Sequence, residues 1–382
     1  MGRRRTFGSV RKLPSGRFQA RIEIAGGDRI KAPETFETRK AAELWLSSQN
    51  VARAEGTWID RREGAVTLAE YSESWLAGRL GRPSTLVRDR GYVERYIVGD
   101  RLGAMPIGHI QPRQIRAWIA DLGARGTRGL APATIAKAGQ ILGSILDQAV
   151  ADRRIPSNPA VLVSWPKAEP LDLVVLTPAQ IEELAAAIDP RYRLFVLLGC
   201  YAGLRAGELC ALRVGDVDTL ARTVRITRTL TEVSGHLHEG PPKTKAGRRS
   251  VPIPGWLAEE IGLALDGALV DDLVFEAPRG DGPMRLASWR TRYWRDATKA
   301  AGIPDFRIHD MRHTAVSLWI AAGYDARQIA TWAGHSSVVS VFDRYGHLIP
   351  GQDTADLMDR LDALRAASLA SAPAGKLVPL RQ

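Results

Sequence analysis

The sequence contains few of the residues on which several classes of protein depend. Cysteine occurs only twice in 382 residues, at Cys200 and Cys210, and both lie in apolar segments. We therefore expect two small buried side chains in a reducing compartment, without a redox or metal role. No apolar run approaches the roughly 20 residues of a membrane span, and no apolar signal segment follows the basic residues 1–5. These absences predict a soluble, cytoplasmic protein without a membrane partner.

Lysine is also scarce. It supplies nine of the 53 basic residues, so that 44 are arginine. Because the pKa of arginine exceeds about 12, an arginine side chain does not act as a general acid. Each lysine is therefore more informative here than in a chain of ordinary composition.

The positive charge is concentrated in the first half of the chain. The net charge is +11, of which residues 1–64 carry +6 and residues 65–170 carry +5, whereas residues 171–382 hold 25 basic and 25 acidic side chains. Basic segments attract polyphosphates by releasing counterions. We interpret the excess as a nucleic-acid interface, and the alternative is a solvated basic surface.

The first predicted domain, residues 1–64, is a small sheet backed by one helix. Phe18, Ala20, Ile22 and Ile24 alternate along one strand, as expected for a half-buried sheet. The first 22 residues hold seven basic and no acidic side chains, and a basic sheet face suits a DNA groove. The candidate DNA contacts are Arg3, Arg4, Arg5, Arg11, Lys12 and Arg17.

The second predicted domain, residues 65–165, is entirely helical. Thr67 and Glu70 have the spacing of a capping box at the start of a helix. Further helices are expected at 84–97, 112–122 and 132–152, where apolar residues recur at helical spacing.

The third predicted domain, residues 175–368, is mainly helical with a small antiparallel sheet. A strand at 224–230 is expected to pair with 249–253 across a loop rich in glycine, proline and lysine. Helices are expected after Thr177 and at 191–214, 255–265, 287–301, 308–322, 325–334, 336–346 and 353–368, before a tail at 369–382. The predicted fold class is therefore multidomain: a small β-sheet plus helix, an all-α domain, and a mixed, mainly α domain.

An arginine in an apolar setting marks the first candidate site. Arg205 lies in the segment Ala-Gly-Leu-Arg-Ala-Gly-Glu, between two helix-like stretches joined through Gly203. An arginine among apolar neighbours needs an anionic partner. That partner is either Glu208, one turn later, or a bound phosphate towards which Glu208 orients the guanidinium.

Further candidate residues follow in chain order. Lys243 and Lys245 are expected at the tip of the hairpin, and His309, Arg312, His335 and Tyr345 come later. Together with Arg205, these types provide a nucleophile, cations for a phosphate and proton donors, which suffice to cut a DNA phosphodiester without a metal or other cofactor. His313 and His347 are expected either to pack beside these residues or to support them, and Trp332 and Phe342 are expected to lie in the core.

These motifs resemble those of the tyrosine recombinases of the phage integrase family. The family's motifs are matched in order by Gly-Leu-Arg-x-x-Glu-Leu, a hairpin lysine, His-x-x-Arg-His-Thr, Gly-His-Ser-Ser and Arg-Tyr-Gly-His. The likeness covers residues 177–350. Residues 65–165 resemble the family's core-binding domain, and the first 60 residues are similar to the sheet domain with which larger integrases bind arm-type sites.

The resemblance implies a covalent mechanism. Tyr345 would attack the scissile phosphate and form a 3′-phosphotyrosyl bond, which frees a 5′-hydroxyl. Lys245 would protonate the leaving oxygen, with Lys243 as the alternative, and His309 would assist proton transfer at the tyrosine.

The resemblance also implies how the phosphate is held. Arg205 and Arg312 would clamp its non-bridging oxygens, and His335 would donate a further hydrogen bond. Glu208 would support the arginines.

The implied partners are double-stranded DNA, at core-type and arm-type attachment sites, and further copies of the chain in a tetramer. An excisionase and a host DNA-bending protein are additional partners that the family suggests. The expected function is to integrate and excise a mobile element in a bacterial host. The alternatives are a type IB topoisomerase-like enzyme and a DNA-binding protein that does not cleave. The N-terminal domain favours an integrase over a resolvase of chromosome dimers.

The predicted division of labour is testable with fragments. We expect residues 1–64 to bind a DNA sequence distinct from the one bound by residues 65–382, because the two basic segments belong to different domains. Footprinting of each fragment on the attachment DNA measures this, and protection of one shared sequence by both would contradict the two-site prediction.

Overall fold

The computed structural model describes residues 8–23, 29–55, 58–127, 129–168, 173–280, 282–335, 337–348 and 362–363. The chain divides into two compact units, Met1–Pro170 and Leu171–Gln382. Three separate hydrophobic cores form, one from Ala20 to Leu46, one from Leu68 to Val163 and one from Leu176 to Tyr345. The protein is thus multidomain and rich in helix, with small antiparallel sheets.

Several predicted features fall outside the described residues. These are Ile24, the DNA contacts Arg3, Arg4 and Arg5, and, apart from residues 362 and 363, the C-terminal helix and tail. In the described part of the chain, no helix is both long and apolar enough to cross a membrane.

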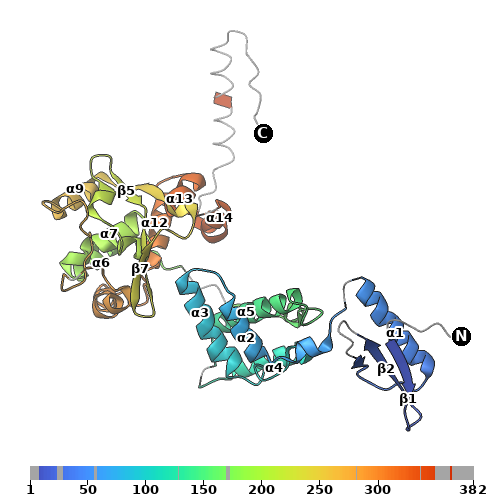
Figure 1. The fold of residues 1–382 in the computed structure, drawn as a ribbon. Coiled ribbons are helices and arrows are strands. Elements are labelled where there is room, and N and C mark those ends of the chain that lie inside the picture. The colour runs from blue at the N-terminus through green and yellow to red at the C-terminus, as the bar shows by residue number, and fades with distance from the viewer. Residues whose placement is uncertain are drawn as a thin grey trace. The chain divides into compact units, whose positions relative to one another are not determined.

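The first core is a three-stranded antiparallel sheet covered by one helix. The strands β1 (Gly8–Lys12), β2 (Phe18–Glu23) and β3 (Arg29–Lys31) pair in this order, and α1 (Arg39–Ala54) packs on the sheet (Figure 1). The predicted alternation is confirmed, because Ala20 and Ile22 are buried against Ala42 and Leu46 of α1.

The second core is built from helices alone. The helices are α2 (Leu68–Ala77), α3 (Pro83–Val93) with the π-helical turn η2 (Glu94–Val98), α4 (Pro112–Gly123) and α5 (Pro132–Ala151). Short 3-10 helices are η1 (Arg61–Ala65), η3 (Ile107–His109) and η4 (Pro159–Leu162). The predicted capping box is confirmed, because the Thr67 hydroxyl accepts from the Glu70 amide and the Glu70 carboxylate accepts from the Thr67 amide.

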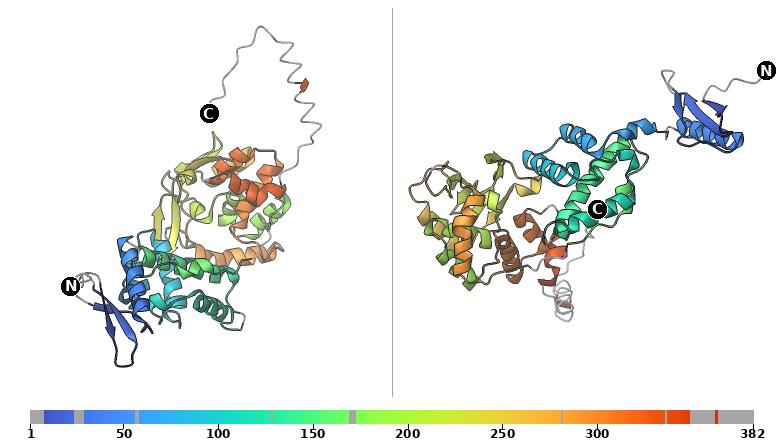
Figure 2. Two further views of the ribbon diagram at one scale, coloured as in Figure 1. Left: turned by 90° about the vertical axis from the view of Figure 1, so that its right-hand side faces the viewer. Right: turned by 90° about the horizontal axis from the view of Figure 1, so that it is seen from below.

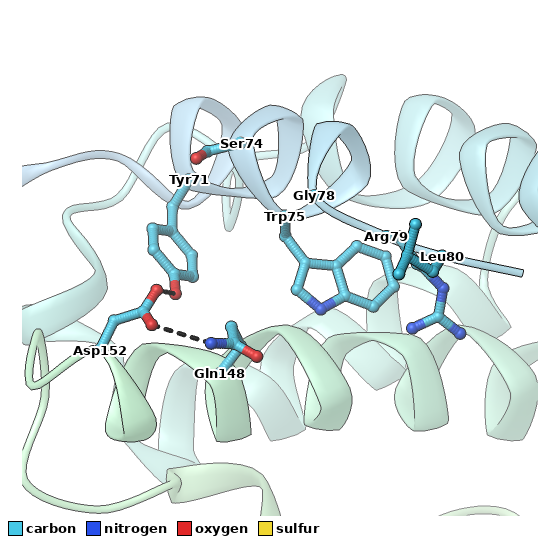
Figure 3. A pocket seen from close by; sticks show the side chains of 8 residues that line it. All are labelled: Tyr71, Ser74, Trp75, Gly78, Arg79, Leu80, Gln148 and Asp152. Carbon is cyan, nitrogen blue, oxygen red and sulfur yellow. Dashed lines mark hydrogen bonds between the residues drawn. The ribbon is translucent and has the colours of Figure 1, made fainter.

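A cavity of about 410 Å³ lies between α2 and α5 (Figure 3). Tyr71 and Gln148 both donate hydrogen bonds to Asp152, over 2.5 Å and 2.8 Å. Trp75 lines the same cavity, and the Arg79 guanidinium stacks 4.3 Å from its ring centroid. The hydrogen bond from Tyr71 to Asp152 therefore joins α2 to the end of α5.

The third core combines helices with two small sheets. The helices are α6 (Pro178–Ala187), α7 (Arg193–Tyr201), α8 (Ala206–Leu209), α9 (Gly255–Ala264), α10 (Leu286–Trp289), α11 (Arg295–Ala300), α12 (Asp310–Ala321), α13 (Ala326–Ala333) and α14 (Val339–Tyr345). Short 3-10 and π-helical turns are η5 (Pro190–Tyr192), η6 (Val214–Asp216), η7 (Lys245–Gly247), η8 (Arg290–Trp294) and η9 (Gly346–Leu348).

The strands of this unit form a three-stranded sheet and a separate hairpin. The sheet has the order β4 (Val217–Asp218), β5 (Thr223–Ile226) and β8 (Arg249–Pro252), and the hairpin joins β6 (Thr229–Val233) to β7 (His236–Gly240). All pairings are antiparallel.

The predicted strand at 224–230 is wrong in one respect. The pairing of 223–226 with 249–252 is confirmed, but the chain leaves the sheet after Ile226 and residues 229–233 pair with 236–240 instead. The hairpin tip is therefore at Ser234 and Gly235, which both have positive φ, as a tight two-residue turn requires. Lys245 does not lie at that tip but begins η7, which precedes β8.

Two helices at the middle of this unit approach closely. Residues 194–200 of α7 are buried, and α7 packs on α12 (Figure 1). A Cβ atom at Gly199 would lie 2.6 Å from the Met311 sulfur, so a larger residue there would displace the Met311 side chain. Figure 2 shows α12, α13 and α14 gathered beside one another, in orange and red, from two further sides.

Two side-chain predictions have different outcomes. Cys200 and Cys210 are free and buried, as predicted, and burial raises the pKa of each thiol. Phe342 is 53% exposed, so its predicted core position is wrong. The buried face of α14 consists instead of Val341 and Tyr345, four residues apart on the helix.

Candidate active site

The Arg205 motif is held by a buried carboxylate. Arg205 is the N-cap of α8, and Glu208 accepts hydrogen bonds from its backbone amide and from its Nη1, both over 2.9 Å. The same carboxylate accepts from Nη1 and Nη2 of Arg249, each over 2.9 Å. The Glu208 and Arg249 side chains are only 2% and 3% exposed. Burial alone would raise the pKa of Glu208, but the hydrogen bonds and charges of Arg249 and Arg205 hold that pKa below its usual value.

Arg249 also joins separate segments of the site. Besides its bonds to the carboxylate, it donates from Nη1 to the Gly247 carbonyl in η7, over 3.1 Å. It donates from Nε to the Trp332 carbonyl near the end of α13. One guanidinium thus ties the turn that begins with Lys245 to the helix that leads to His335.

Arg312 enters the site from the first turn of α12. It is buried, and its Nη1 donates to the Gly203 carbonyl over 2.7 Å. Gly203 has a φ of 62°, and a Cβ there would lie 3.0 Å from Trp319, so this carbonyl position depends on glycine. Burial, followed by the charges of Arg205 and Arg249, lowers the pKa of Arg312 to about 9.

His335 follows the left-handed turn that ends α13. Gly334 has a φ of 59°, and a Cβ there would lie 2.9 Å from the Ala246 carbonyl oxygen of η7. Arg205 Nη2 donates to the Gly334 carbonyl over 3.2 Å, which places His335 next to the Arg205 network. Burial, together with the charges of Arg312 and Arg205, lowers the pKa of His335 to about 4.

The two candidate lysines lie in and just before η7. Both are exposed, and Lys245 is the first residue of the 3-10 turn whose backbone meets Gly334. Lys243 precedes this turn by two residues. The backbone contact brings the Lys245 turn beside His335, whereas the choice between the two lysines remains a prediction.

Tyr345 ends α14, and its side chain is buried. Its hydroxyl makes a hydrogen bond with Nδ1 of His313, one turn after His309 on α12. The His309 ring stands edge-on to the His313 ring, with the centroids 5.1 Å apart, and His309 is itself exposed. Burial raises the pKa of Tyr345, although the charges of Arg312 and Arg344 lower it in part. His313, expected to pack beside the catalytic residues or to support them, is the histidine in contact with the tyrosine hydroxyl.

Sequence reasoning thus missed two residues of the site. His313 stands directly after Arg312 in the sequence, and the one available signal was its spacing of four residues from His309, which puts both rings on one face of a helix. Arg249 begins a strand of alternating burial, in which an inward-facing arginine implies a buried partner. Neither signal identifies the partner, because Glu208 is 41 residues from Arg249 in the sequence and Tyr345 is 32 residues from His313.

The site holds more positive than negative charge. Arg205 and Arg249 both bind the Glu208 carboxylate, the charge of which also acts on Arg312, while Asp310 is paired with Arg307. Within the described residues, Arg312 Nη2 and His335 Nδ1 are buried without a hydrogen-bond partner. Buried donors are normally satisfied. This arrangement therefore suits an anion that brings its own acceptor oxygens.

No group of three or more histidine, cysteine or acidic side chains in the described part of the chain has the geometry of a metal site. In the N-terminal sheet, Arg11 and Lys12 are exposed on β1. Arg17 donates to the Thr35 hydroxyl and carbonyl, so it is partly engaged within its own domain.

Comparison with known proteins extends these observations. The Phage integrase family model matches residues 174–351, and the model of the phage integrase N-terminal domain matches residues 6–55. The prophage phiRv2 integrase of Mycobacterium tuberculosis is 30% identical over 361 residues, which cover 92% of this chain and 94% of that protein.

The chain belongs to the phage integrase family. It is therefore a site-specific tyrosine recombinase, as its sequence motifs predicted, and this membership favours recombination over the topoisomerase-like and non-cleaving alternatives.

Two solved structures share the fold. The Tn1549 transposon integrase in complex with transposon right-end DNA has a TM-score of 0.63 at 20% identity, covering 79% of this chain and all of that one. A λ integrase tetramer bound to a Holliday junction has a TM-score of 0.52 at 17% identity, covering 88% of this chain and 94% of that one.

Removal of Arg249 is expected to destabilise the recombinase. Arg249→Met leaves Glu208 buried without its bidentate partner, and such a loss costs about 3–5 kcal/mol of the free energy of unfolding. Urea unfolding of Arg249→Met and of the unchanged protein measures the difference in the free energy of unfolding. Arg248→Met is the matched control, because it removes the same charge from the exposed neighbouring position. Equal unfolding free energies for the two variants would contradict a structural role for the Arg249–Glu208 pair.

Proposed function

We propose that this site cleaves DNA through attack of Tyr345 on a phosphodiester, forming a 3′-phosphotyrosyl intermediate and a free 5′-hydroxyl. The observation that carries the proposal is a pair of buried nitrogens, Arg312 Nη2 and His335 Nδ1, that have no hydrogen-bond partner among the described residues and lie beside an excess of positive charge. A scissile phosphate supplies the missing charge and acceptor oxygens. Because the pentavalent transition state carries more negative charge on those oxygens, donors fixed before the reaction stabilise it more than the ground state.

The phosphate-holding residues have distinct parts in this proposal. Arg205 and Arg312 bind the non-bridging oxygens, and His335 donates one further hydrogen bond. Glu208 keeps the Arg205 guanidinium in place, since its carboxylate accepts hydrogen bonds from the backbone amide and the Nη1 of Arg205. The Gly203 and Gly334 turns support the proposal, because each places a backbone carbonyl against one of these arginines.

Proton transfer to the leaving group is assigned to Lys245. Its turn is joined to the rest of the site by Arg249 and meets Gly334, next to His335. An ammonium group gives up its proton at accessible pH, whereas the surrounding guanidinium groups do not. The phosphotyrosyl ester retains the bond energy of the phosphodiester that it replaces. The 5′-hydroxyl can therefore reverse the step without a nucleotide cofactor.

The wider function is proposed from the family and from the charge distribution. The helical residues 65–165 would bind core-type DNA and residues 1–64 arm-type DNA, where Arg11 and Lys12 are exposed on β1. Four copies would act together, as in the λ integrase tetramer on its junction. The reaction would integrate and excise a mobile element in the cytoplasm of a bacterial host, with an excisionase and a DNA-bending protein as further partners.

The nucleophile is tested with a nicked suicide substrate. The unchanged protein is expected to form a covalent DNA adduct that survives denaturing electrophoresis, because the broken strand diffuses away before religation. Tyr345→Phe should form none while still binding the DNA, since it loses only the attacking oxygen. Tyr324→Phe, an exposed tyrosine of the same unit, is the control. An adduct in Tyr345→Phe would refute the assignment.

The general acid is tested with a substrate whose bridging 5′-oxygen is replaced by sulfur, because a thiolate leaves without being protonated. Lys245→Ala is expected to slow cleavage of ordinary DNA by about 10²- to 10⁴-fold, the usual contribution of a general acid. The sulfur substrate should restore its rate, and Lys243→Ala should cleave both substrates normally. The opposite pattern would assign the proton to Lys243.

A further inference from the structure

The hydrogen bond between Tyr345 and His313 involves the hydroxyl whose proton the nucleophile must lose. The tyrosine hydroxyl and His313 Nδ1 form a hydrogen bond, and both residues are buried, with 1% and 5% of their surface exposed. The two rings come from different helices, α14 and α12, with centroids 5.7 Å apart. Tertiary packing therefore places the Nδ1 atom of His313 against the attacking oxygen.

His313 is in the protonation state that an acceptor requires. Burial, followed by the charge of His309, lowers the pKa of His313 to about 4, so the ring is neutral near pH 7. The other charged groups that influence it are Asp310, which raises the pKa, and Arg344 and Arg307, which lower it. A neutral imidazole carries one ring hydrogen, and a hydroxyl that donates to Nδ1 requires this hydrogen on Nε2.

His309 is placed differently. Its ring meets the edge of the His313 ring, it is exposed, and in the described part of the chain no hydrogen bond joins it to Tyr345. His309 therefore lies beside His313 and not against the tyrosine hydroxyl.

We propose that His313, rather than His309, accepts the phenolic proton of Tyr345 when the tyrosine attacks DNA. This inference rests on the proposed cleavage chemistry. It makes His313 a catalytic residue, because it touches the reacting oxygen, and His309 a positioning residue.

The step balances without another reactant. The O–H bond of Tyr345 breaks and its proton passes to His313 Nδ1, while the phenolic oxygen forms a bond to phosphorus. The bond from phosphorus to the 5′-oxygen breaks, and that oxygen takes a proton from Lys245. In religation the 5′-hydroxyl returns its proton to the lysine, and the departing tyrosine oxygen recovers its own from His313.

A neutral imidazole of low pKa is a sufficient acceptor here. The phenol becomes strongly acidic as its oxygen bonds to phosphorus, so the proton moves downhill during attack rather than before it. The negative charge of the bound phosphate also offsets the charge of Arg344, which otherwise disfavours a protonated His313. Before DNA binds, the same low pKa keeps Tyr345 protonated and unreactive.

The test compares His313→Asn, His313→Ala and His309→Asn in the full-length protein on the suicide substrate. The asparagine amide retains a hydrogen-bond acceptor near the position of Nδ1 but is not a base. Both changes at position 313 are expected to slow cleavage by about 10²- to 10⁴-fold, the usual contribution of a general base, and His309→Asn to have a smaller effect. DNA binding and the thermal unfolding midpoint are measured alongside, as controls for folding.

Two chemical probes separate a proton acceptor from a merely structural residue. A ring-fluorinated tyrosine at position 345, whose phenol is more acidic, should restore cleavage to His313→Asn. The substrate with bridging sulfur should restore Lys245→Ala and leave His313→Asn slow. Full cleavage by His313→Asn, or rescue of His309→Asn alone by the fluorinated tyrosine, would overturn the proposal. If the unchanged protein forms no adduct at all, the cleavage function fails instead.

One measurement needs no substitution at position 313. Nitrogen NMR of the protein labelled at histidine is expected to show one histidine with an unprotonated, hydrogen-bonded Nδ1, whose signal shifts in Tyr345→Phe. A protonated Nδ1 at the histidine that responds to Tyr345→Phe would also overturn the assignment, even if the His313 variants failed to fold.

Discussion

The buried ion pair between Glu208 and Arg249 is the constraint on which the rest of the site depends. A carboxylate and a guanidinium taken out of water are tolerated only when each is fully hydrogen-bonded, and here all the bonds lead to functional segments. Glu208 fixes Arg205, and Arg249 fixes the turn of Lys245 and the end of α13. The positions of these cations are thus set by the same interactions that stabilise the core, before any DNA arrives.

The remaining geometry depends on backbone that only glycine adopts. Gly203 and Gly334 both have positive φ, and at each a side chain would press on a neighbouring segment within 3.0 Å. Their carbonyls accept from Arg312 and Arg205. The protein in this way uses backbone acceptors to orient two guanidinium groups and leaves the excess positive charge uncompensated. Burial first, and then the uncompensated charges of Arg312 and Arg205, lower the pKa of His335.

Charge and burial also explain how a tyrosine beside arginines stays inactive. The cations favour phenolate, but burial opposes it more strongly, and the pKa of Tyr345 is raised overall. The neutral His313 ring holds the phenolic hydroxyl without removing its proton. In the proposed mechanism, activation of the nucleophile depends on the arrival of the phosphate, because only the bond to phosphorus makes the phenol acidic enough to lose its proton.

The sequence by itself determined the elements and most of the chemical inventory. Periodicity predicted the helices and the capping box at Thr67, and the motif order identified the family and the residues Arg205, Arg312, His335 and Tyr345, because local spacing is visible in one dimension. The sequence did not reveal that β6 pairs with β7, that Arg249 is the partner of Glu208, or that His313 meets Tyr345. Each of these contacts joins two segments, and neither segment carries a sequence signal that identifies the other. Only packing decides which buried donor meets which acceptor, since burial makes an unpartnered polar group costly and so selects the pairing.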